Sequence, residues 1–153
     1  MSTLDNSILF SEQHPMMTPI SVMFYDTDAA GVVHNIAYLR FIETARTLLA
    51  LEYGMDWATM KETSVFPVVL RTEIDYRYPA LLGDLVEVES WIGEISAARF
   101  WCHFNIHRPS DGLLLVTCKQ SLAFVKMPEG KVQRLPKGFP TPFIPRASRD
   151  GVR

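Results

Sequence analysis

The sequence is poor in cysteine and in positive charge, and each shortage excludes a class of protein. Its 153 residues include two cysteines, Cys102 and Cys118, too few for a disulfide framework or a cysteine metal site. The formal net charge is -2, whereas general nucleic-acid binding depends on clustered lysine and arginine. We therefore expect no nucleic-acid partner, and we interpret the cysteines as small buried residues of strands.

Long apolar runs are also missing. No stretch reaches the roughly 18 uninterrupted apolar residues that indicate a membrane-spanning helix. The segment Met1 to Thr18 has no basic stretch followed by an apolar one, so it does not resemble a secretory signal. A cytoplasmic location is the resulting expectation.

Several catalytic motifs are absent as well. Neither a Gly-x-Ser-x-Gly elbow nor a phosphate-binding glycine loop occurs, which argues against serine hydrolases and P-loop enzymes. His103 and His107 are four residues apart on an expected strand, hence about 13 Å apart, too far to share a metal ion. We expect neither a metal nor a cofactor.

The composition that remains is that of one globular domain. Apolar residues make up 48% and charged residues 21% of the chain, and the length suits a single core. We expect an N-terminal arm at 1–18, a folded domain at 19–127, and an irregular proline-rich tail at 128–153.

The segment from Phe24 to Arg46 is the most informative part of the sequence. It reads as a strand end at 20–25, a tight loop with two aspartates and a glycine, and the start of the only long helix, with Asn35 as its N-cap. Gly54 is placed to end that helix. Its apolar residues occupy so much of the circumference that one face cannot hold them, so we expect it to be wrapped by the rest of the fold. These residues are Ile36, Leu39, Phe41, Ile42, Ala45, Leu48 and Leu49.

After a short helical turn capped by Asp56, the apolar period changes from helical to two, which is typical of strands. Strands are expected near 70–78, 85–92, 99–108 and 113–126, with a break at Gly93 and a hairpin at 109–112. On the first of them the buried face should be Leu70, Thr72, Ile74, Tyr76 and Tyr78. One long helix and a meander of strands indicate an α+β fold in which an antiparallel sheet curls around a central helix.

The loop and helix together resemble a known family. Asp-Thr-Asp-Ala-Ala-Gly-Val-Val, then Tyr38-Leu39 and Glu43-Thr44-Ala45-Arg46, are similar to the signature of the hotdog-fold 4-hydroxybenzoyl-CoA thioesterase family, on its acyl-CoA thioesterase branch. The resemblance implies a hotdog fold and hydrolysis of a short-chain or aromatic acyl-CoA thioester. It also implies a homodimer or homotetramer whose sheets pair edge to edge, with the active site at the junction.

The same resemblance assigns the catalytic carboxylate to Asp28, the second aspartate of the Asp-x-Asp pair. From the residues alone, an aspartate in such a loop is more commonly a turn or cap residue. Asp28 is expected to act either as a nucleophile or as a general base on water. Asp26 fits a structural role, in which it hydrogen-bonds the loop backbone.

The resemblance to the family signature also implies which positions bind the substrate. The backbone N–H of Asn35 maps to the oxyanion donor, Gly31 permits a close approach of the loop, and Val33 and His34 adjoin them. Family members often carry an aromatic residue and then histidine or tyrosine where this chain has His34-Asn35, so no side-chain role carries over to Asn35. His34 either orients water or contacts the acyl group, or has no catalytic duty.

Glu43 is the rival to Asp28, because some hotdog enzymes carry their carboxylate on this helix. The alternative is an intrahelical pair with Arg46 or Thr47.

The CoA phosphates require basic groups at the pocket mouth. The candidates for that role, each equally explained by surface solvation, are Arg71, Arg77, Arg99, Lys126, Lys131 and Arg134.

Two other functions are compatible with these residues. One is the same hydrolysis on an acyl carrier protein, and the other is a non-catalytic protein that binds acyl thioesters, since a fold does not specify an activity.

Overall fold

The computed structural model describes residue 12 and residues 14–140. Most of the expected arm and the end of the expected tail, residues 1–11 and 141–153, lie outside this range. The elements are β1 (Met16–Ser21), the 3₁₀ turn η1 (Phe24–Asp26), α2 (Asn35–Glu52), α3 (Trp57–Thr63), β2 (Val65–Tyr76), β3 (Leu85–Ile95), β4 (Arg99–Arg108), β5 (Leu113–Lys126) and β6 (Lys131–Gln133).

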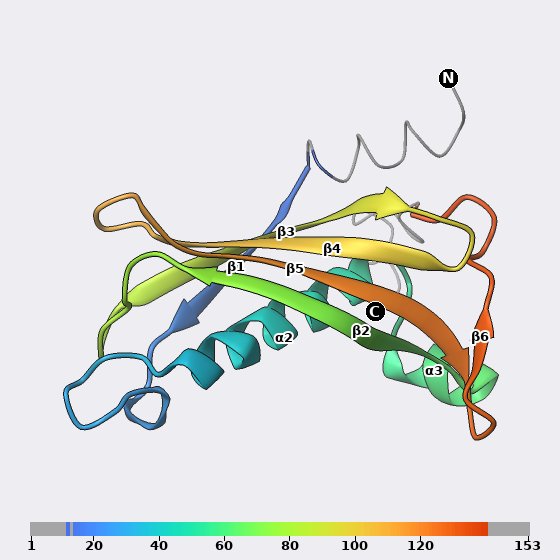
Figure 1. Cartoon of the computed structure of the whole chain (residues 1–153), viewed down its shortest axis with the longest axis horizontal. Coiled ribbons are helices and arrows are strands. Elements are labelled where there is room, and N and C mark those ends of the chain that lie inside the picture. The colour runs from blue at the N-terminus through green and yellow to red at the C-terminus, as the bar shows by residue number, and fades with distance from the viewer. Residues whose placement is uncertain (1–11, 13, 141–153) are drawn as a thin grey trace, which may run out of the picture.

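The strands form one antiparallel sheet in the order β1-β3-β4-β5-β2, and β6 pairs with the end of β5. Figure 1 shows the sheet curling over α2, with the loop before α2 at one end of the molecule and α3 and β6 at the other. This arrangement confirms the expected α+β class and the expected wrapping of an antiparallel sheet around one long helix.

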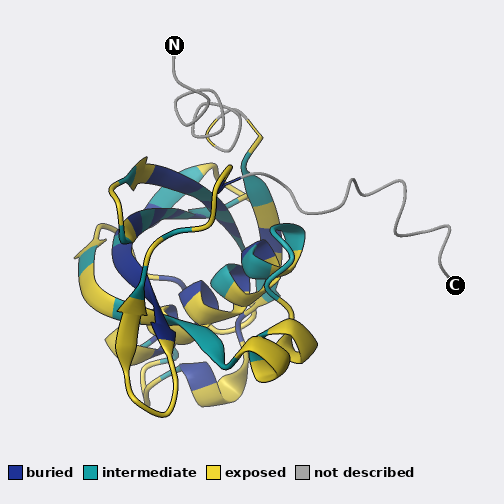
Figure 2. Cartoon of the chain, turned by 90° about the vertical axis from the view of Figure 1, so that its right-hand side faces the viewer, coloured by how far each residue is buried: buried dark blue, intermediate teal, exposed yellow. Residues whose placement is uncertain are grey.

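The core lies between α2 and the concave face of the sheet, where Figure 2 shows the buried segments gathered. Phe41, Ile42 and Ala45 of α2 have no exposed surface. The alternation predicted for β4 is confirmed, since Phe104 and Ile106 are also fully buried. Each such large side chain contributes about 1.5–3 kcal/mol by leaving water, so this contact fixes α2 against the sheet.

The sheet wraps α2 but does not cover all of its apolar residues within the single chain. Ile36 is 68% exposed, and Leu39, Leu48 and Leu51 are also exposed. The reason is that the curled sheet covers one side of the helix, which contacts β1 and β3 and, through side chains, β2 and β5. An apolar side of α2 therefore faces outward.

The strand predicted at 20–25 is also wrong in its bounds. β1 begins at Met16, inside the expected arm, and ends at Ser21. Phe24–Asp26 forms a 3₁₀ turn instead, because the Asp26 carboxylate accepts a hydrogen bond from the Met23 backbone N–H at 2.9 Å and closes the chain on itself.

The predicted buried face of β2 is largely wrong. Leu70, Tyr76 and Tyr78 are 45%, 48% and 53% exposed, and Ile74 is the member that packs against the core. Two features explain this: β2 is an edge strand, and a bulge between Val69 and Arg71 shifts its register against β5. The bulge leaves Leu70 without a partner on β5. Thr72, Ile74 and Tyr76 still share the face toward α2, where the Tyr76 ring lies 5.6 Å from that of Tyr38, and their exposure follows from the edge position.

Other local predictions hold with adjusted bounds. Asp56 caps α3 by accepting from the Thr59 N–H at 2.7 Å, and Gly54 follows α2 with a φ of 78°. β3 runs through Gly93 to Ile95 with a bulge where the break was expected. Cys102 and Cys118 are buried, as predicted. None of the helices in the described part of the chain is both long and apolar enough to span a membrane.

Candidate active site

The loop between η1 and α2 is a closed turn. An isolated bridge joins Thr27 to Val33, the Asp28 N–H donates to the Val32 carbonyl at 2.9 Å, and the Gly31 N–H donates to the Asp28 carbonyl at 3.0 Å. Gly31 has a φ of 76°, in the left-handed region where glycine is favoured. A Cβ there would meet no atom within 4 Å. The glycine therefore serves the turn, and no close approach within the chain requires it.

The Asp28 carboxylate stands exposed on this loop. Its Oδ1 accepts hydrogen bonds from the backbone N–H groups of Ala30, at 2.9 Å, and Val32, at 3.3 Å. Both donors belong to the loop, so this is an Asx turn. Across the described residues no hydrogen bond joins the carboxylate to the first turn of α2. The second oxygen is left for solvent or a ligand.

The start of α2 leaves backbone donors open. The N-cap is His34, one residue earlier than predicted, and its side chain makes no capping hydrogen bond. The Ala37 N–H reaches the His34 carbonyl at 3.0 Å. In the described part of the chain no acceptor is present for the N–H of Asn35 or Ile36. Two donors at the positive end of the helix dipole are thus available to an oxyanion.

A pocket opens beside these donors. Its volume is about 290 Å³, and it is lined by Val33, Asn35, Tyr38, Tyr76, Arg77, Tyr78 and Pro79. The rings of Tyr38 and Tyr76 lie 5.6 Å apart, and the Tyr76 hydroxyl donates to the Asn35 carbonyl at 3.1 Å. Burial raises the pKa of both phenols, so they stay neutral at physiological pH. The pocket combines aromatic walls, open N–H donors and one arginine.

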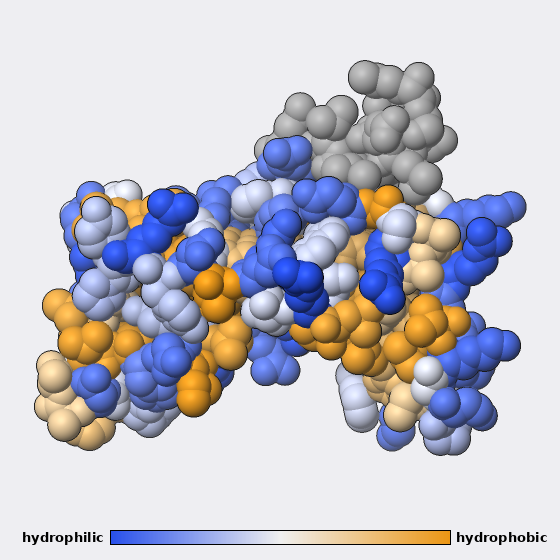
Figure 3. All heavy atoms as spheres, in the orientation of Figure 1, coloured by the Kyte–Doolittle hydropathy of each residue, from blue (hydrophilic) through white to orange (hydrophobic). Residues whose placement is uncertain are grey.

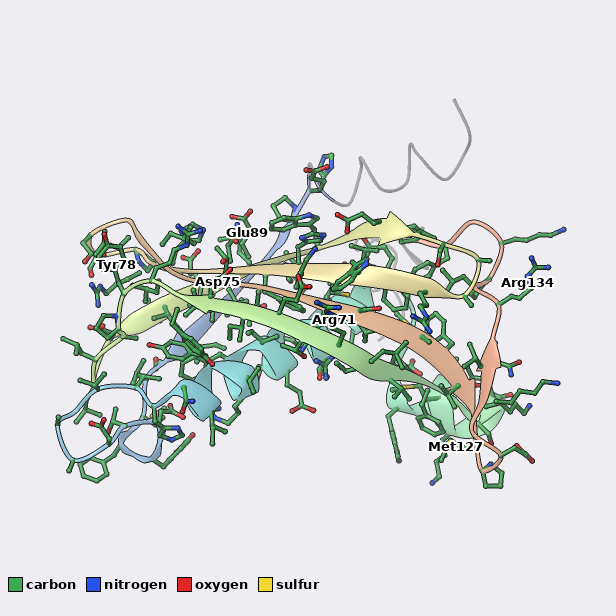
Figure 4. All side chains as sticks on the ribbon, viewed as in Figure 1. Arg71, Asp75, Tyr78, Glu89, Met127 and Arg134 are labelled. Carbon is green, nitrogen blue, oxygen red and sulfur yellow. The ribbon has the colours of Figure 1, made fainter. Side chains whose placement is uncertain are left out.

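Sequence reasoning missed the tyrosines as site residues. The alternation of β2 assigned Tyr76 and Tyr78 to the core, and Tyr38 was noted only within the family signature. Their position depends on how α2 packs against the edge strand β2, which no local pattern encodes. Figure 4 shows Tyr78 at the end of the sheet nearest the loop, and Figure 3 shows apolar side chains gathered at that same end.

The loop rests on the connection between β2 and β3. The Val33 N–H donates to the Ala80 carbonyl and the Leu82 N–H to the Gly31 carbonyl, both at 2.9 Å. Arg108 of β4 stabilises this connection by donating hydrogen bonds to the Pro79 carbonyl at 3.2 Å and to the Asp84 carboxylate at 2.9 Å. The catalytic candidate is therefore carried by a loop with fixed support on the sheet side.

Glu43 lies apart from Asp28. Its side chain is 69% exposed and 3.7 Å from Arg46, the intrahelical pair expected as the alternative to catalysis. Arg46 in turn donates to Gln120 at 2.6 Å, and Gln120 donates to Thr72 at 3.1 Å. This bridge from α2 to β5 and β2 was not predicted, because its partners are far apart in sequence.

The basic candidates for CoA binding separate into two groups. Arg77 lines the pocket beside Asn35, and Arg71 lies midway along β2 (Figure 4), paired with Glu73 at 2.8 Å. Lys126 pairs in register with Val65, at the far end of β2, about 36 Å from Tyr76. Arg99, at the start of β4, pairs with Ala123 of β5, which lies between Lys126 and Ser121, the partner of Arg71. One chain does not bring all four together.

The two histidines of β4 each contact a different glutamate. His103 lies 2.8 Å from Glu94, and His107 lies 3.6 Å from Glu89. Within the described residues no three histidine, cysteine, aspartate or glutamate side chains are grouped as metal ligands would be.

Comparison with known proteins gives consistent matches. The family model described as the thioesterase-like superfamily matches residues 22–143. Acyl-CoA thioester hydrolase YbgC of Escherichia coli is 39% identical over 131 residues, which are 82% of this chain and 92% of that protein. Acyl-CoA thioesterase YbgC of Haemophilus influenzae is 31% identical over 141 residues, 92% of this chain and 96% of the relative. The crystal structure of a probable thioesterase from Bartonella henselae superposes with a TM-score of 0.74 at 29% identity, covering 80% of this chain and all of that one.

Proposed function

The chain belongs to the thioesterase-like superfamily, and we propose that it hydrolyses an acyl-CoA thioester to the free acid and coenzyme A. The observation that carries the proposal is an exposed carboxylate, Asp28, on the loop that leads directly into α2, where Asn35 lines a pocket at a helix start without a side-chain cap. The activities named for the YbgC relatives support it.

Thioester chemistry needs little more than this. The thiol of the leaving group has a pKa near 8.5 by analogy with cysteine, so it departs as a thiolate without an acid to protonate it. As a nucleophile, Asp28 adds to the carbonyl carbon, the C–S bond breaks to release the thiolate, and water hydrolyses the resulting anhydride. As a general base, Asp28 takes a proton from the water that attacks.

The helix terminus supplies the electrostatic part. In either route the carbonyl oxygen becomes negative, and the N–H of Asn35 is the donor that we assign to it. Gly31 keeps the loop in its turn, Val33 lines the pocket, and His34 orients water or contacts the acyl group. The aromatic walls favour a short-chain or aromatic acyl group, because both fit a small apolar pocket.

We propose that the working unit is a homodimer paired along β2. This edge strand leaves backbone groups unpaired and carries exposed apolar residues, among them Val68 and Leu70. Two such edges paired antiparallel place the Lys126 end of one chain beside the Tyr76 end of the other. Basic residues from both groups, Arg77 and Arg71 with Arg99 and Lys126, then reach the CoA phosphates of one site. A homotetramer of two such dimers is the larger alternative.

The test is a panel of acyl-CoA and acyl-carrier-protein thioesters, followed by thiol release. We expect saturable hydrolysis of short-chain or aromatic acyl-CoA, unchanged by a metal chelator because no cofactor is proposed. Faster hydrolysis of the carrier-protein substrates would indicate an acyl-carrier-protein thioesterase instead. A folded protein that binds acyl-CoA and hydrolyses none of the panel would contradict an enzymatic function.

A further inference from the structure

The position of Asp28 relative to the helix depends on what ties the loop to α2. The carboxylate and its donors lie within the turn from Thr27 to Val33, so its position is tied to that of the turn. The β2–β3 connection supports it on the sheet side. The helix side is held by a different residue, Asp26, immediately before the turn.

Asp26 connects three segments. One carboxylate oxygen, Oδ2, accepts from the Met23 N–H after β1, at 2.9 Å. The other, Oδ1, accepts from Nε of Arg40 on α2, at 3.2 Å, and from Nη2 of the same guanidinium. The Asp26 backbone carbonyl accepts from the N–H of His34, the N-cap, at 3.1 Å. The strand exit, the turn and the helix start thus meet at one residue.

Arg40 is itself held in place. Its guanidinium carbon lies 5.2 Å from the centre of the Tyr25 ring and 5.0 Å from that of Phe41. A planar guanidinium packed against two rings keeps its orientation, which suits two N–H contacts with the single oxygen Oδ1 of Asp26. Asp26 is 1% exposed, whereas the Arg40 side chain is 44% exposed.

We propose that the Asp26–Arg40 pair is a positioning clamp for the proposed reaction: it sets the distance between the Asp28 carboxylate and the open N–H groups of α2. Neither residue touches substrate in this role. The expected effect on kcat rests on the proposed function. The geometry of the clamp does not, because it is a property of the loop and helix alone. A displacement of about 1 Å between reacting groups can lower a rate by about 100-fold.

The asymmetric burial gives a way to separate positioning from stability. Arg40→Met leaves a buried carboxylate without its charge partner, which is strongly destabilising. Asp26→Asn leaves an arginine that reaches water and costs less. Replacing both partners removes the unpaired charge, so stability is expected to return toward that of the wild type.

The experiment measures kcat, KM and thermal unfolding for Asp26→Asn, Arg40→Met, the double variant and Arg40→Lys. We expect kcat to fall about 10- to 100-fold in both single variants and in the double variant, with KM within about threefold of the wild type. Arg40→Lys keeps the charge but loses the planar guanidinium, so its kcat should fall between that of the wild type and that of Arg40→Met. Glu94→Gln, an exposed carboxylate paired with His103 on another part of the sheet, is the matched control and should leave kcat unchanged.

A double variant with both stability and kcat restored would show that the pair is only structural, and the proposal would be wrong. Single-variant losses that multiply in the double variant would also contradict a shared role. Amide hydrogen exchange of 27–33 gives a readout that needs no turnover: we expect faster exchange in Arg40→Met and in the double variant, and unchanged exchange would refute the clamp. If the wild-type protein hydrolysed none of the thioesters, the proposed hydrolysis would be wrong. The exchange measurement would still test whether the Asp26–Arg40 pair orders the turn.

Discussion

The exchange of Asp28 for asparagine is the most direct test of the proposed chemistry, because the structure predicts that it changes charge and little else. Oδ1 of Asp28 accepts from the N–H groups of Ala30 and Val32, and an asparagine Oδ1 can accept the same two bonds. The residue is exposed, so the free energy of unfolding should change by less than about 0.5 kcal/mol.

Catalysis should respond very differently. If Asp28 supplies general-base catalysis, turnover should fall by about 10² to 10⁴, which is about 2.7–5.4 kcal/mol of transition-state stabilisation. Glu43→Gln is the comparison: Glu43 is exposed and pairs with Arg46, so turnover of this variant should change by less than about threefold.

The assay follows thiol release from one good acyl-CoA substrate, with thermal unfolding of each variant as the control for folding. Asp28→Ala adds a second control, because it loses both loop hydrogen bonds and should cost about 1–3 kcal/mol of stability. A folded Asp28→Asn protein within about threefold of wild-type turnover would refute the assignment. A folded and inactive Glu43→Gln protein would transfer the role to Glu43.

Three other measurements follow from the structure. Burial raises the pKa of Cys102 to about 12, so neither it nor Cys118, which is shifted similarly, should react with iodoacetamide at pH 8 until the protein unfolds; rapid native labelling would contradict the burial. Arg108 lowers the pKa of Asp111 below its ordinary value of 3.8, so the carboxylate contributes stability that is present above that pH and lost as the pH falls below it. The unfolding temperatures of wild type and Asp111→Asn should accordingly differ at pH 6, and the difference should shrink only as the pH falls below 3.8 and through the lowered pKa. Sedimentation should show at least a dimer, and Leu70→Asp on the β2 edge should shift it toward monomer with lower activity; a fully active monomer would exclude a shared site.

Local sequence rules fixed the elements that depend on neighbours along the chain. Alternation predicted β4 with Phe104 and Ile106 inside, and an aspartate three residues before a backbone donor predicted the cap of α3 at Asp56. The loop-to-helix order around Asp28 and Asn35 was likewise readable, apart from a one-residue shift of the N-cap to His34. These features are determined by φ/ψ preference, side-chain period and short-range hydrogen bonds.

The tertiary structure decided what depends on segments distant in sequence. The sequence indicated that Asp26 would bond the loop, which its contact with the Met23 N–H confirms, but its partner Arg40 lies 14 residues away on another element. Tyr76 faces α2 as its alternation predicts, but it forms a pocket wall because β2 is an edge strand, and an alternating pattern is the same on an edge strand as inside a sheet. Packing over the whole core decides which side chains of α2 and β2 meet. A local pattern specifies the periodicity of one segment but not the segment against which it packs.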